Sequence, residues 1–173
     1  AILCLETGGV RLQEANLGLA AIADIHAAIV DLRRYVPVIG IIAGTVGCFG
    51  GMSIAAALCS YLIVTREARL GLNGPQVIEQ EAGIEEYDSR NRPFIWSLTG
   101  GEARYRTGFV DALVDDSLAA VRKAATDCIA MGRPASLRCE RYDDYLEKLN
   151  AFDTREQASA ERAAALFGKG ERS

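Results

Sequence analysis

Two pairs of adjacent glycines are the residues of this sequence whose spacing points most directly to chemistry. Gly8 and Gly9 lie in "LETGGVRLQEA", and Gly50 and Gly51 lie in "GCFGGMSIAAA". In both stretches a β-type run ends at the glycines and a helical run follows. Glycine lets a ligand approach the backbone closely, and a helix start presents unpaired N–H groups at the positive end of the helix dipole. Two such turns at one end of a parallel sheet can aim two N–H donors at one oxygen, as an oxyanion hole does.

Three other interpretations of the glycine turns are weighed against this one. Either turn alone is explained by tight backbone geometry or close helix packing. A nucleotide site is not expected, because neither G-x-G-x-x-G nor G-x-x-x-x-G-K-[ST] occurs and no lysine lies near the glycines. The stretch "GMSIA" approaches the nucleophile elbow of serine hydrolases, with Ser53 in the serine position but Ala55 in place of the second glycine. The one histidine, His26, lies beside the apolar stripe of a helix, which favours a structural role over a catalytic base.

Charged side chains supply one further candidate near the first glycine pair. Arg11 could attract an anionic substrate, although a pairing with a carboxylate such as Glu14 explains it equally well. Asp143, Asp144 and Glu147 share one face of an expected helix and are interpreted as solvated charges rather than as an acid/base pair. No metal site is expected.

Composition and charge narrow the class of protein. The chain has 173 residues, 50% of them hydrophobic and 24% charged, as in a single globular domain. Its net charge of -4 argues against a broad nucleic-acid surface. Its five cysteines lack CxxC spacing and histidine partners, which favours free thiols in a reducing cytoplasm. No signal peptide is recognised. The chain lacks an initiator Met and opens directly on the strand-like run "AILCLE", so we expect it to begin inside a larger fold.

A long uncharged run requires a membrane interpretation to be tested. The run from Tyr35 to Thr65 exceeds the ~20 residues that cross a bilayer. It contains five glycines and Pro37, however, and changes midway from the β-branched "PVIGII" to the alanine-rich "SIAAAL". A strand, a glycine turn and a buried helix explain that change better than one spanning helix. No membrane span is therefore expected.

Strands and helices alternate along the first two thirds of the chain. The expected strands are "AILCLE", "VIGII", "YLIVT", "ARLGL" and "FVDALVDD". The expected helices are 12–35, the run from about Gly50, "NGPQVIEQ" with Pro75 at its first helical position, short pieces split by Gly100 and Gly101, and "SLAAVRKAATDCIAMG", "YDDYLEKLNAF" and "REQASAERAAALFG". Residues 82–92 are expected to form a loop that could cover a site. Alternation of this kind predicts a parallel sheet with right-handed crossovers.

Four stretches, in this order and at these separations, resemble the β subunit of biotin-independent malonate decarboxylase: "ETGGVRLQEA", "GCFGGMSIAAALCSYLIV", "LGLNGPQVIEQEAGIEE" and "GFVDALVDD". That subunit is similar to the N-terminal half of acyl-CoA carboxyltransferases and belongs to the crotonase-like superfamily. The resemblance covers residues 1 to about 130. It implies an α/β crotonase-like spiral domain over residues 1–130, without its N-terminal portion, followed by a helical C-terminal extension over residues 131–173.

The resemblance also implies a reaction. A malonyl thioester on an acyl carrier protein loses carbon dioxide and becomes an acetyl thioester. The intermediate is an enolate, so negative charge develops on the thioester oxygen, where preorganised N–H groups act. The family pattern places one donor on the turn of Gly8 and Gly9 and the other on Gly50 or Gly51, which are the expected catalytic residues. The expected substrate-binding residues are Arg11, Ser53, Asn73 and Gly74.

One departure from the wider superfamily restricts the reaction. In its hydratase branch a carboxylate follows the second glycine turn, and Ser53 holds that place here. Hydration of an enoyl thioester is therefore not implied, whereas a decarboxylation needs no general base to begin. Ser53, Tyr61 and water are open candidates for the donor that protonates the enolate.

The implied partners are two other proteins. A γ subunit, similar to the other carboxyltransferase half, shares the active site, and an acyl carrier protein brings the phosphopantetheine-type thioester; no cofactor is expected on this chain. The helices from Ser117 onward offer a contact surface for the γ subunit, although packing within the chain explains them equally well. Two alternatives stay open: a subunit that transfers the carboxylate to biotin, and a non-catalytic assembly subunit. Also open are free coenzyme A as the carrier, the stoichiometry and the activity of this chain alone.

Overall fold

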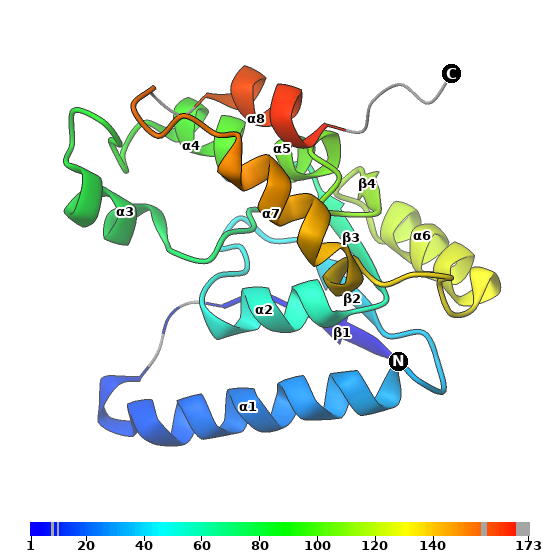
Figure 1. Cartoon of the computed structure of the whole chain (residues 1–173). Helices are drawn as coiled ribbons and strands as arrows, with labels where there is room; N and C mark the ends of the chain where they lie inside the picture. The colour runs from blue at the N-terminus through cyan, green and yellow to red at the C-terminus, as the bar shows by residue number, and fades with distance from the viewer. Residues whose placement is uncertain (8, 10, 157–158, 169–173) are drawn as a thin grey trace.

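The core of the protein is a four-stranded parallel sheet (Figure 1). The computed structural model describes residues 1–7, 9, 11–156 and 159–168. The strands are adjacent in the order in which they occur along the chain: β1 (Ile2–Cys4), β2 (Ile39–Ile42), β3 (Tyr61–Thr65) and β4 (Ala112–Val114). In this register Ile2 lies opposite Ile39, and Ile39 lies opposite Tyr61. The predicted parallel α/β fold is confirmed.

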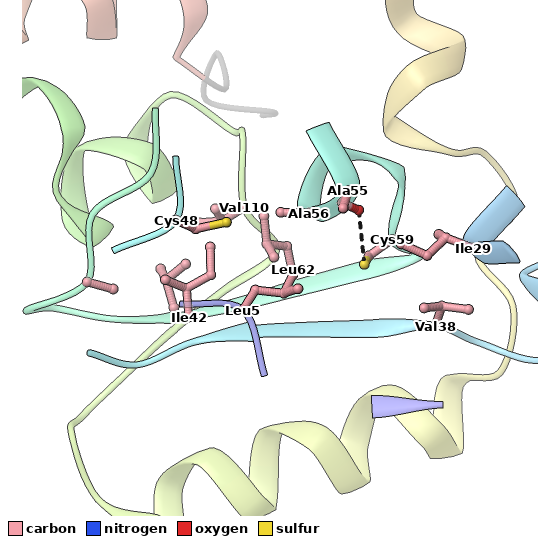
Figure 2. Packing of buried hydrophobic residues seen from close by; sticks show 12 residues of the cluster. Leu5, Ile29, Val38, Ile42, Cys48, Ala55, Ala56, Cys59, Leu62 and Val110 are labelled. Carbon is pink, nitrogen blue, oxygen red and sulfur yellow. Dashed lines mark hydrogen bonds between the residues drawn. The ribbon is translucent and has the colours of Figure 1, made fainter. Parts of the chain in front are cut away.

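The two central strands are apolar on both faces because helices cover both. Side chains of a strand point alternately to its two faces. Ile42, Leu62 and Val64 pack toward helix α2 (Gly51–Leu58), as Figure 2 shows for Ile42 and Leu62. The alternate residues Ile41 and Ile63 pack on the other face, against helix α6 (Leu118–Met131). A strand buried in this way reads as a continuous hydrophobic run, which is why "VIGII" and "YLIVT" were recognisable in the sequence.

Helix α1 (Ala15–Leu32), preceded by the short 3-10 helix η1 (Leu12–Glu14), runs along α2 on the outside of the molecule (Figure 1). Its predicted apolar stripe is only partly buried. Ile29 is 4% exposed and joins the core beside α2, whereas Leu19 and Leu32 are 64% and 42% exposed. The amphipathic helix was therefore predicted correctly, but part of its apolar surface is not covered within the described residues.

The carboxyl end of α2 is fixed by two arginines from distant segments. The guanidinium of Arg33 donates to the Leu58 carbonyl at 2.8 Å. The guanidinium of Arg138 donates to the carbonyls of Ala57 and Cys59, each at 3.2 Å, and also pairs with the carboxylate of Asp111. Cations placed at the end of a helix satisfy its last carbonyls and oppose its dipole. Residue 138 belongs to the predicted C-terminal extension, which therefore packs against the body of the domain.

The remaining helices surround the carboxyl half of the sheet and its flank. They are α3 (Pro75–Ala82), α4 (Arg92–Thr99), α5 (Gly101–Arg106), η2 (Arg138–Arg141), α7 (Tyr142–Asn150) and α8 (Ala160–Phe167). Helix α3 stands apart from the sheet in Figure 1 and has no buried residue. The rings of Phe109, Tyr145 and Phe167 form a cluster that joins α7 and α8 to the segment before β4. The C-terminal helices thus pack within the chain, one of the two roles expected of them.

Two sequence predictions about secondary structure were wrong. The segment "ARLGL" is not a strand: only isolated bridges occur there, from Leu70 to Cys48 and from Arg69 to Gly100. Its main chain instead braces the second glycine turn. The last helix begins at Ala160 rather than at Arg155, because the Ser159 side chain accepts from the Arg162 N–H and caps it there.

The cysteines are free thiols, as predicted. Burial raises the pKa of the Cys48 thiol to about 12 and that of Cys59 to about 11, with the guanidiniums of Arg138 and Arg33 opposing the rise at Cys59. Both thiols therefore behave as apolar core groups rather than as nucleophiles. Within the described residues, no helix combines the length and apolar character needed to cross a membrane.

Candidate functional site

The segment that follows β1 contacts the second glycine turn at one edge of the sheet. Strands β1 and β2 are parallel neighbours, so their carboxyl ends meet at the same edge. Thr7, just after β1, donates its N–H to the Gly47 carbonyl at 2.9 Å. The Thr7 hydroxyl accepts from the Phe49 N–H at 2.9 Å and donates to the Phe49 carbonyl at 3.3 Å. Thr7, which precedes the first glycine pair, therefore clamps the end of the β1 segment onto the second turn.

Gly9 and Gly50 give these turns their shape. Gly9 has a φ of 110° and is exposed, and Gly50 has φ 63° and ψ −145°. The latter combination is essentially restricted to glycine, and it lets the chain turn sharply from β2 into α2. Gly8, the other predicted residue of the first turn, lies outside the described residues.

The free backbone donors of the second turn are at Gly51 and Met52. The N–H of Gly50 is already used, because it donates to the Leu72 carbonyl at 2.7 Å. The N–H groups of Gly51 and Met52, at the start of α2, have no hydrogen-bond acceptor within the described parts of the chain. Both residues are partly exposed. Two unpaired donors thus lie at the positive end of a helix, on residues that are partly exposed.

Arg69 braces the loop that leads into the second turn. Its guanidinium donates to the carbonyls of Thr45 and Val46, at 3.1 and 3.0 Å, and lies over the ring of Trp96 at 4.6 Å. Its own carbonyl accepts from the Cys48 N–H at 2.9 Å. Burial, reinforced by a neighbouring arginine, lowers the pKa of this guanidinium from its ordinary value. Sequence reasoning missed Arg69, since nothing in its neighbourhood along the chain marks it.

Ser53 lines a small cavity beside the helix start. Its hydroxyl donates to the Gly50 carbonyl at 2.7 Å. The cavity has a volume of about 210 Å³, and its wall includes Leu72, Arg104 and Arg138. Arg104 donates to the Leu70 carbonyl at 2.7 Å, and burial lowers the pKa of its guanidinium. Ser53 and the two arginines thus line one cavity that extends along α2.

The structure does not place the other predicted residues all at this edge of the sheet. Asn73 is exposed and directly follows the residue whose carbonyl holds Gly50, and Gly74 is the N-terminal cap of α3. Arg11 forms an exposed ion pair with Glu14 at 3.2 Å, the alternative considered from the sequence. Tyr61, at the start of β3, faces α6, so the structure does not bring it to the glycine turns.

The single histidine does not form a catalytic pair with Ser53. Its Nε2 atom lies 2.8 Å from the Gly51 carbonyl, whereas the Ser53 hydroxyl is directed to Gly50. The serine-hydrolase interpretation therefore finds no support in the geometry. Within the described residues, no group of three or more His, Cys, Asp or Glu side chains is arranged to hold a metal ion.

Replacing Thr7 by valine tests the clamp on the second turn. The substitution keeps the shape of the side chain but leaves the Phe49 N–H without its acceptor. We expect the free energy of unfolding to fall by about 1–3 kcal/mol, because a partly buried donor loses its partner. Urea denaturation followed by circular dichroism measures this, with Thr7→Ser as the matched control that retains the hydroxyl. Equal stability of the valine and serine variants would contradict the clamp.

The chain has a parallel sheet with glycine turns at its carboxyl edge and crossover helices on both faces. This architecture is the crotonase-like fold of the carboxyltransferases. The chain is 67% identical to a chain of a Pseudomonas malonate decarboxylase hetero-tetramer solved with malonate, with a TM-score of 0.93. It is 65% identical, with a TM-score of 0.78, to a chain of the Pseudomonas MdcD-MdcE hetero-dimer of malonate decarboxylase. The homologues of this chain are thus malonate decarboxylase subunits and carboxyltransferases, which confirms the resemblance drawn from its motifs.

A relative of known activity comes from another organism. Over 125 residues the chain is 44% identical to the malonyl-S-ACP:biotin-protein carboxyltransferase MADC of Malonomonas rubra. That match covers 72% of this chain and 39% of the relative. The two Pseudomonas structures cover 96% and 87% of this chain, which spans 60% and 61% of theirs. No family model matches the chain.

Proposed function

We propose that the chain acts as the β-type subunit of a malonate decarboxylase and takes part in the conversion of a malonyl thioester into an acetyl thioester and carbon dioxide. The observation that carries the proposal is the contact of Thr7, just before the first glycine pair, with the second glycine turn, at the edge where Gly51 and Met52 present unpaired donors. The 67% identity to a malonate decarboxylase chain supports the reaction. The crotonase-like domain is assigned to residues 1–130 and the helical extension to 131–173.

The reaction breaks the bond between the carboxylate carbon and the α-carbon. The electron pair of that bond forms the double bond of an enolate, the former carbonyl oxygen takes the negative charge, and carbon dioxide leaves. A proton then adds to the α-carbon. Donors that are preorganised around this oxygen stabilise the transition state more than the ground state.

Each predicted residue has a role in this scheme. One donor is assigned to the pair Gly8 and Gly9, while Gly50 shapes the second turn and Gly51 supplies the other donor. The substrate-binding residues are Arg11, Ser53, Asn73 and Gly74. Ser53 or water protonates the enolate, since the Ser53 hydroxyl borders the cavity beside the turn.

The homologues support partners in a hetero-oligomer, and the particular partners are part of this proposal. The two Pseudomonas structures are hetero-oligomers of malonate decarboxylase. We assign to this chain a γ-type partner subunit and an acyl carrier protein whose phosphopantetheine-type arm carries the malonyl group. The chain itself holds no cofactor in this scheme. Free thiols agree with work in a reducing cytoplasm.

A second function is favoured by one specific observation. The Malonomonas relative is named a carboxyltransferase to a biotin protein. Such a subunit uses the same enolate chemistry, and the two functions differ only in the fate of the carboxyl group. In one the carbon dioxide is released, and in the other it is transferred to biotin.

The deciding experiment follows the carboxyl carbon. The chain is assembled with its partner subunits and given a malonyl thioester of the carrier protein labelled with carbon-14 in the free carboxyl group. Release of labelled carbon dioxide without biotin, and unchanged by avidin, supports the decarboxylase. Label retained on a biotin protein supports the carboxyltransferase. If the thioester keeps its label in both assays, the proposal is wrong.

A further inference from the structure

His26 is the only histidine of the chain, and its ring contacts the start of α2. It lies in α1, and its Nε2 atom is 2.8 Å from the Gly51 carbonyl oxygen. A carbonyl oxygen can only accept, so Nε2 carries the proton and donates it. The ring is partly buried between α1 and α2.

The peptide that His26 contacts is the one that carries the Met52 N–H. A peptide unit is planar and trans, so its C=O and N–H point in opposite directions. A donor that fixes the Gly51 carbonyl therefore also fixes the direction of the Met52 N–H. A hydrogen bond at the carbonyl end polarises the amide as well and makes the N–H a stronger donor.

A second contact holds α1 against the same point. Ile22 lies one turn before His26 on α1, and a Cβ added to Gly51 would lie 2.8 Å from its Cγ2 atom. Residues four apart on a helix share a face. The face of α1 that carries Ile22 and His26 therefore fits closely against a residue that has no side chain. This packing leaves the peptide between Gly51 and Met52 little freedom to rotate.

We propose that His26 is a positioning residue that holds the Gly51–Met52 peptide so that its N–H group faces the developing oxyanion. This inference rests on the proposed function, because the oxyanion is the enolate formed by decarboxylation. His26 does not touch the substrate in this account. It acts through the backbone of α2, and Met52 joins Gly51 as a donor.

Two substitutions of matched length test the role. His26→Met removes the donor, whereas His26→Gln keeps an N–H donor on a side chain of the same length. In the assembled complex we expect His26→Met to lower kcat by about 10- to 100-fold with little change in KM, since a small misplacement of a catalytic group has effects of that size. His26→Gln is expected to recover most of the rate. A role in stability alone would lower the fraction of folded protein and leave kcat per folded complex unchanged.

A spectroscopic measurement gives a readout that does not depend on turnover. Gly51 and Met52 form the only Gly–Met pair in the sequence. Labelling glycine carbonyls with carbon-13 and methionine amides with nitrogen-15 therefore gives one correlation peak in an HNCO experiment. We expect His26→Met to shift this peak and His26→Gln to leave it close to its original position.

The outcomes separate the two proposals. If the original complex releases no carbon dioxide while the peak shifts in His26→Met, the proposed function fails and the catalytic role of His26 fails with it, although the contact is real. If the original complex is active and His26→Met keeps the full kcat, the role of His26 is refuted and the proposed function stands. A peak that does not move in His26→Met would contradict the contact itself.

Discussion

Replacing Gly50 by alanine is expected to lower kcat for release of carbon dioxide by about 10²- to 10³-fold, the effect of losing one oxyanion donor. The cause is backbone strain rather than a steric clash, because a Cβ at this position would meet nothing within 4 Å. At φ 63° and ψ −145° an alanine costs about 1–3 kcal/mol, and the chain relieves this strain by rotating the neighbouring peptides. One of those peptides carries the Gly51 N–H. Assay of the purified complex with malonyl thioester measures the loss.

Gly18→Ala is the matched control for this substitution. Gly18 lies within α1, where a Cβ also meets nothing within 4 Å and φ is not positive. Alanine there should raise the free energy of unfolding by about 0.5–1 kcal/mol and leave kcat unchanged. If Gly50→Ala turns over at the original rate while remaining folded, the glycines only pack, and the chain is a non-catalytic assembly subunit.

Replacing Gly101 by alanine is expected to destabilise the fold more than any surface change. The first residue of α5 lies against β3, and a Cβ there would overlap the Thr65 carbonyl oxygen. The obstacle is backbone rather than a side chain that can rotate, and the Gly101 N–H also bonds to the Ala68 carbonyl at 2.8 Å. We expect the free energy of unfolding to fall by about 3 kcal/mol or more, because the sheet or α5 must shift.

Urea denaturation measures the effect of Gly101→Ala. Gly18→Ala serves again as the control, since it makes the same chemical change where there is room for it. A midpoint close to that of the original protein would show that α5 does not pack on β3 as described. It would also remove the support that the Arg69 segment, which lies between β3 and α5, gives to the second glycine turn.

Local patterns were sufficient for most of the fold. Strands β2 and β3 are apolar on both faces, so their sequences contain uninterrupted runs of branched and aromatic residues bounded by turns. Pro75 and the Ser117 side chain mark the starts of α3 and α6, where such residues favour a helix start. The parallel order of the strands followed from their alternation with helices.

The details of the site could not be predicted from local sequence patterns, because they depend on contacts between residues far apart in the chain. Thr7 and Phe49 are 42 residues apart, and His26 is 25 residues from Gly51. The sequence predicted that the two turns share an edge, but not that Thr7 contacts the second turn. It also left Gly50 and Gly51 as equal donors, and the bond from the Gly50 N–H to Leu72 separates them. The strand predicted at "ARLGL" failed for a related reason, because that main chain pairs with a glycine turn rather than with a strand.

A crystal structure of the assembled complex with a non-hydrolysable malonyl thioester analogue tests the central claim most directly. The account predicts that the thioester carbonyl oxygen lies about 2.7–3.1 Å from the Gly51 N atom and from a backbone N of the first glycine turn. A carbonyl oxygen bound elsewhere, with both turns facing solvent or a partner's side chains, would contradict it.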